Sequence, residues 1–163
     1  MRQYFDPGRP VYSWFNELCQ VVEGMGVSFR DRSVAHLDLV QEATDPVWSE
    51  LFKADRAQAE AALQRDLPFL RRQVEQFAFS AVVCTSARVL REVSQMLDVR
   101  VERSGTEARL RWSVGTAELR RGPICVVGWN IPLKRPTGLS RDGHRQFGRL
   151  LASQMKRVGI VLR

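Results

Sequence analysis

Residues 124–140 decide the fold, and they run Ile124-Cys125-Val126-Val127-Gly128-Trp129-Asn130-Ile131-Pro132-Leu133-Lys134-Arg135-Pro136-Thr137-Gly138-Leu139-Ser140. The opening run, 124–127, is apolar without interruption, which is typical of a strand in a parallel sheet covered on both faces. A polar loop follows, with two prolines and Gly138 to fix its shape. Open α/β sheets form their sites at the carboxyl ends of strands, so we expect residues 128–140 to be part of any functional site.

A basic amphipathic helix is predicted to leave this loop at Ser140 and to end near Val158. Its apolar face carries Phe147, Leu150, Leu151, Met155 and Val158. Another side carries Arg141, Arg145 and Arg149, at the i, i+4, i+8 spacing that forms a row along a helix.

Upstream, apolar runs predict two more buried strands, at 35–40 and 80–84. Helices are predicted over 11–22, over 55–65 with a restart at Asp66-Leu67-Pro68 that makes one kinked helix, and over 85–97. Short antiparallel strands are predicted at 99–102, 109–114 and 117–120, with turns at Ser104-Gly105 and Gly115-Thr116. This order predicts an α/β class: a three-layer α/β/α domain with a short, mostly parallel sheet and a small antiparallel excursion. At 163 residues, a single domain over 1–163 is expected.

Composition and motifs argue against several kinds of site and location. Cys19, Cys84 and Cys125 are far apart, and His36 and His144 lack metal-ligand spacing, so neither a disulfide framework nor a metal site is expected. The chain has no P-loop or GxGxxG motif, so we expect no cofactor. It also has no signal-like or membrane-spanning apolar stretch, which predicts a cytoplasmic protein without a membrane partner.

Charge is concentrated at the C-terminal end. The chain carries 25 basic and 18 acidic residues, a net charge of +7. Residues 130–163 contain eight Lys or Arg and one acid, Asp142, so their net charge of +7 equals that of the whole chain. A clustered positive face is the electrostatic footprint of a polyanion binder. The alternative is a solvated surface helix in an arginine-rich chain.

Several motifs resemble the uracil-DNA glycosylase superfamily, over roughly residues 35–155. The matching segments are Leu37-Asp38-Leu39-Val40, Asp66–Val74, Val82–Ala87, and Trp129–Leu133 with the helix after it. The resemblance implies a DNA-binding domain that recognises or excises a damaged base, without a cofactor. The family's first strand and its water-activating loop have no counterpart here. Either the domain lacks an N-terminal strand, which another segment or chain would supply to complete the sheet, or the sheet closes differently. We expect this chain alone to be inactive.

The resemblance also suggests roles for three residues. Asn130, where the family usually has His, would donate its amide to the departing base as the catalytic residue; the alternative is a turn residue. Asp38 would accept hydrogen bonds from an exocyclic amine of the base, or else cap a loop. Trp129 would stack on a base, or else be a buried aromatic at the strand end.

DNA contacts are expected from the loop and the helix after it. The candidate phosphate-binding residues are Lys134, Arg135, Thr137, Ser140, Arg141, Arg145 and Arg149. Leu133 or Leu139 would wedge into the duplex, or else both are core anchors. The alternative function is a non-catalytic regulatory domain that binds protein or RNA.

Overall fold

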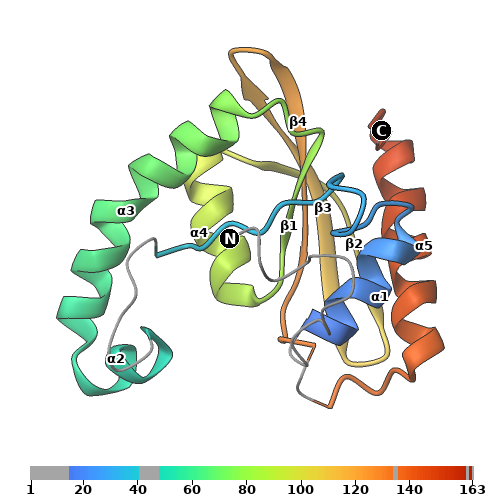
Figure 1. Ribbon diagram of the computed structural model, residues 1–163, viewed down its shortest axis with the longest axis horizontal. Coiled ribbons are helices and arrows are strands. Elements are labelled where there is room, and N and C mark those ends of the chain that lie inside the picture. The colour runs from blue at the N-terminus through green and yellow to red at the C-terminus, as the bar shows by residue number, and fades with distance from the viewer. Residues whose placement is uncertain (1–14, 41–47, 134–135, 161, 163) are drawn as a thin grey trace. The chain divides into compact units, whose positions relative to one another are not determined.

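The computed structural model describes residues 15–40, 48–133, 136–160 and 162 (Figure 1). The chain forms two compact units, one of residues 1–35 and 79–163 and the other of residues 36–78. The single domain expected from the sequence stays a prediction. No helix in the described ranges is both long and apolar enough to cross a membrane.

One four-stranded mixed sheet forms the centre of the larger unit. Its strands are β1 (Ala81–Cys84), β2 (Arg100–Glu107), β3 (Leu110–Leu119) and β4 (Gly122–Trp129), in the order β1-β4-β3-β2. The α/β class is confirmed. The sheet is not mostly parallel, however, because β1–β4 is its one parallel pair while β2–β3 and β3–β4 are antiparallel.

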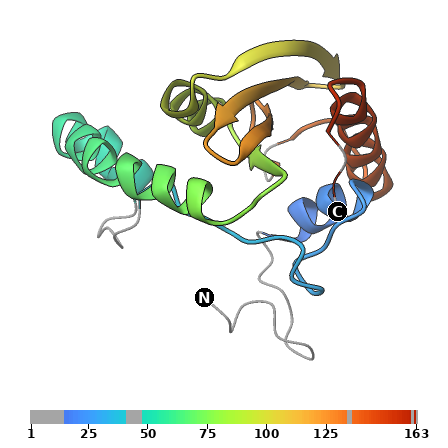
Figure 2. The same cartoon turned by 90° about the horizontal axis from the view of Figure 1, so that it is seen from above.

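Helices cover the sheet on both faces (Figure 2). On one face, Cys125, Val127 and Trp129 share a core with α1 (Asn16–Gly24) and α5 (Arg141–Arg157). The alternate residues of β4 point the other way, where a Cβ at Gly128 would lie 2.9 Å from Leu90 of α4 (Ala87–Leu97). This alternation across β4 confirms the predicted three layers within the larger unit.

Two strand predictions were wrong. Residues 35–40 form no strand. Leu37, Leu39 and Val40 are only half-buried, and Ala35 and Asp38 are exposed, so there is no continuous buried run. The three short strands expected between 99 and 120 are two long ones, β2 and β3. Gly105 and Gly115 lie inside these strands. Each is glycine because a Cβ would lie only 2.5 Å from a neighbouring group, the Trp112 ring for Gly105 and the Arg100 carbonyl for Gly115. They are sites of close approach, not turns.

The helix starts follow the predicted capping residues. Ser86 accepts a hydrogen bond from the Val89 amide at the start of α4, and Ser140 accepts one from the Gly143 amide at the start of α5. In α1 the helix begins at Asn16, and residues 11–14 of the predicted helix lie outside the described residues.

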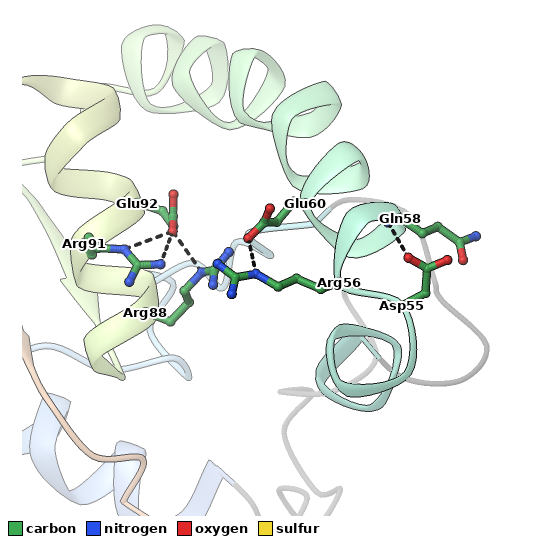
Figure 3. A network of polar contacts seen from close by, with 7 residues as sticks. All are labelled: Asp55, Arg56, Gln58, Glu60, Arg88, Arg91 and Glu92. Carbon is green, nitrogen blue, oxygen red and sulfur yellow. Dashed lines mark hydrogen bonds and ion pairs between the residues drawn. The ribbon is translucent and has the colours of Figure 1, made fainter.

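Arginines of α4 hold a buried carboxylate of their own helix. Glu92 is 6% exposed, and its Oε1 lies 2.8 Å from Arg88 Nε and 2.7 Å from Arg91 Nη2 (Figure 3). A buried carboxylate needs such compensation. These two arginines are therefore engaged in structure.

The smaller unit contains α2 (Trp48–Ala54) and α3 (Arg56–Gln76). Asp55 caps α3 by accepting from the Gln58 amide at 2.9 Å (Figure 3). The helix continues through Pro68, which confirms one helix across the predicted restart. Its buried stripe is Ala59, Leu63, Leu70 and Val74.

Candidate nucleic-acid interface

The loop between β4 and α5 runs along the end of the sheet at which β2 turns into β3 (Figure 1). Asn130 fixes its start. The Asn130 side-chain Oδ1 accepts from the Arg111 amide at 2.8 Å, and the Asn130 amide donates to the Arg111 carbonyl at 3.1 Å. The Asn130 carbonyl accepts from Ala87 of α4 at 3.1 Å. Because a backbone N–H holds Oδ1, the Asn130 NH₂ group is the part of the side chain left to meet a ligand.

Thr137 fixes the other end of the loop. Its carbonyl accepts from the Arg109 amide at 3.1 Å, and its Oγ1 accepts from the Leu139 amide at 3.2 Å. The same Oγ1 lies 3.4 Å from His144 Nε2 of α5. Thr137 is 3% exposed. Its side chain therefore anchors the loop and does not face a phosphate, contrary to the role expected from the sequence.

His144 is buried beside this anchor. Burial lowers the pKa of its imidazole, and the carboxylate of Glu17 on α1 partly opposes that effect. The neutral imidazole is thus favoured in the folded protein.

The apolar loop residues are part of the core. Trp129 has no exposed surface, and its ring meets Phe147 of α5 edge-on with centroids 5.6 Å apart. No face of the indole is open to a base, so the buried aromatic is the role observed. Leu133 and Leu139 are partly buried against the same core, as anchors.

The arginine row of α5 is only partly free. Arg145 Nη2 lies 2.7 Å from Glu23 Oε2 on α1, while Arg141 and Arg149 are exposed. Ser140 is the N-cap of the helix; its Oγ accepts from the Gly143 amide, and its O–H donor is left for a ligand. Lys134 and Arg135 lie outside the described residues.

Two arginines that the sequence analysis missed flank the loop. Arg109 and Arg111 are exposed, and their backbones make the bonds to Thr137 and Asn130 described above. A Cβ at Gly138 would lie 4.0 Å from Arg109 Cγ, which places the loop beside that side chain. The alternation Arg109-Leu110-Arg111-Trp112 could have indicated that both arginines leave the core. We call Arg109, Arg111 and Arg141 the basic edge. The acids Glu107 and Asp142 are also exposed at this end of the unit.

Asp38, the residue expected to accept hydrogen bonds from a base, belongs to the smaller unit. It is exposed, and its Oδ1 lies 3.8 Å from Nδ1 of His36. In the described part of the chain, no three His, Cys, Asp or Glu side chains group together in a way that would hold a metal ion.

Comparison with known proteins gave no match. No protein-family model, no curated protein and no solved structure matches the chain. The likeness to uracil-DNA glycosylases therefore rests on the sequence motifs alone.

Proposed function

We propose that the larger unit binds DNA through the basic edge and the loop beside it. The observation that carries the proposal is the pair of hydrogen-bonded anchors, Asn130 with Arg111 and Thr137 with Arg109. They fasten a loop containing Lys134 and Arg135 to a strand end that presents two exposed arginines. Arginine fits phosphate oxygens with two parallel N–H donors, and phosphate contacts provide most of the affinity of non-specific DNA binding.

The position of Arg141 supports this proposal. It is the first residue of α5, where the helix dipole disfavours a cation by about 0.3–1 kcal/mol. A bound phosphate would offset this unfavourable placement, since anions are favoured at helix N-termini.

The finer proposal is a relationship to base excision, with inactivity of this chain alone. A departing base needs a donor, and the NH₂ group of Asn130 would supply one without the positive charge of an imidazolium. The test is incubation with duplexes carrying a panel of damaged bases, followed by strand scission at abasic sites. Release of any base by this chain would contradict the proposed inactivity. The cytoplasm is the compartment we propose for the protein.

The test of DNA binding is affinity as a function of salt. The log of affinity falls linearly with log salt, with a slope of about −0.9 per phosphate contact on a duplex. We expect the triple variant Arg109→Gln, Arg111→Gln, Arg141→Gln to flatten that slope by about 2–3 units. Fluorescence anisotropy with a labelled duplex gives the slope directly.

The matched control removes the same charge elsewhere. Arg120, Lys156 and Arg157 are exposed; Arg120 follows the last residue of β3, and the other two are the last residues of α5. Their change to Gln should leave the slope near that of the parent. Equal flattening by both triple variants would mean diffuse attraction by net charge. A parent with no salt-dependent affinity would overturn the proposal, and a steeper slope with RNA than with DNA would favour the RNA-binding alternative.

A further inference from the structure

Strand β2 leaves one edge of the sheet open. It is hydrogen-bonded to β3 on one side, and it pairs with no other strand among the described residues. Nearly all of its side chains are exposed, so backbone bonds to β3 hold it more than burial does. Such an edge is a template for pairing with another chain.

The hydrogen bonds of β3 show which backbone groups of β2 face the open edge. Arg111 directs its N–H and C=O toward Asn130, away from β2. Its partner across the β2–β3 ladder is Thr106. In an antiparallel ladder both members of such a pair point their backbone groups outward, so Thr106, and by alternation Ser104, offers N–H and C=O to the open edge.

The outward-facing segment is complementary to itself. Residues 103–107 run Arg103-Ser104-Gly105-Thr106-Glu107. Two copies aligned antiparallel about Gly105 place Arg103 opposite Glu107 and Ser104 opposite Thr106, each twice. The Ser104–Thr106 pairs would exchange backbone hydrogen bonds. Arg103 and Glu107 would form the closer, non-hydrogen-bonded pairs, in which opposite charges across a sheet are favourable.

Neighbouring registers lack this match. A two-fold axis at Arg103 would set that arginine against its own copy, and an axis at Thr106 would bring Arg103 against Arg109. An axis at Ser104 would pair no charges at all. The register shift in β2 between Val101 and Arg103 ends the regular edge on one side, and the turn after Glu107 ends it on the other. The edge therefore accepts only a short partner strand.

One side chain is already held in place for this contact. Arg103 Nε donates to Gln154 Oε1 of α5 at 2.7 Å, and Gln154 is buried. The bond orients the guanidinium and leaves its other N–H donors for a carboxylate.

We propose that a second copy of this chain pairs with β2, to give a two-fold symmetric dimer with one continuous sheet across both copies. The paired segment is short, so the dimer is weak and forms in the micromolar to millimolar range. This inference does not depend on DNA binding.

Charge exchange tests the register. The variants Glu107→Arg and Arg103→Glu each set like charges opposite one another twice per dimer. We expect each to weaken dimerisation by roughly tenfold or more. The double variant restores opposite charges and should return the dissociation constant to within a few-fold of the parent. Sedimentation velocity over a wide range of protein concentration measures all four proteins.

Two further variants keep the test independent of the charges. Glu118→Arg makes the same change at an exposed position of β3 away from this edge, and it should dimerise like the parent. Thr106→Pro removes an outward N–H that β3 does not use, so it should abolish the dimer and keep the circular dichroism of the fold. A parent that stays monomeric at the highest concentration, or a double variant no better than the singles, would overturn the proposal.

Discussion

At the scale of single residues, Arg141 combines an unfavourable local position with an exposed charge. Replacing it by Gln removes a cation from the N-terminus of α5. We expect Arg141→Gln to raise the free energy of unfolding by about 0.3–1 kcal/mol while it lowers DNA affinity. Urea unfolding and anisotropy titration measure the two effects. A variant that loses both stability and affinity would indicate a structural role for the arginine instead.

His144 gives a pH dependence with a defined sign. Its pKa in the folded protein is lowered, chiefly by burial, with Glu17 on α1 acting in the opposite direction. The unfolded state therefore binds the proton more readily. The stabilisation is complete above the ordinary pKa of about 6.5 and is lost as the pH falls through it toward the lower folded value. We expect His144→Gln to reduce the loss of stability between about pH 7.5 and pH 5.5. Parallel pH profiles for the parent and the variant would contradict this assignment.

The thiols show a second consequence of burial. Burial raises the pKa of Cys84 and of Cys125 to about 12, with Glu102 adding to the effect at Cys125. Thiolate is the reactive form, so neither should react in the native state at pH 8. Cys19 also has a raised pKa but is only partly buried. Iodoacetamide labelling followed by mass spectrometry should modify Cys19 first. Early labelling of Cys84 would mean that β1 opens readily.

At the scale of elements, α1 and α5 approach closely because two glycines meet. A Cβ at Gly148 would lie 2.0 Å from the Val21 carbonyl, and one at Gly24 would lie 2.1 Å from the Arg145 carbonyl. Backbone cannot yield as a side chain can, so we expect Gly148→Ala to cost about 3 kcal/mol of stability. Gly143→Ala is the matched control. It lies in the same helix, and its Cβ would come no nearer than 3.3 Å to Leu139 and Ser140 side-chain atoms. Equal losses from the two variants in thermal unfolding would argue against the packing explanation.

The elements that the sequence predicted correctly are those with local signals. Three helix starts could be predicted from their N-cap residues, Asp55, Ser86 and Ser140. Each of these side chains accepts a hydrogen bond from the amide three residues later in the chain. The strands between 99 and 120 were misread because Gly105 and Gly115 look like turn residues, whereas each makes room for a group on the neighbouring strand. The register of β2 against β3 decides which group faces each glycine, and the sequence of one strand does not show that register.

The candidate site was predictable to a similar degree. The loop and Arg141 follow from the order of strand, loop and helix. The pairing of Arg145 with Glu23 joins residues 122 positions apart, so no local pattern could reveal it. Arg109 and Arg111 meet the loop through hydrogen bonds of their backbone groups to Thr137 and Asn130, which are distant in the sequence. Trp129 has the large aromatic ring that base stacking requires, and only its packing against Phe147 shows that it is part of the core.

At the scale of the whole molecule, DNA binding and dimerisation are proposed for different residues at the same end of the sheet, and they should respond to different variants. Thr106→Pro changes no charge and acts on the open edge of β2, so it should abolish the dimer and leave the salt slope of DNA binding as in the parent. The Arg109, Arg111 and Arg141 triple variant should flatten that slope and still dimerise. Sedimentation and anisotropy on the same preparations give both readouts. If Thr106→Pro also flattened the slope, the DNA-bound form would require both copies, because a dimer presents two basic edges to one duplex. The two proposals would then describe one assembly, and DNA should shift the sedimentation of the parent to a dimer complex at concentrations where free protein is monomeric.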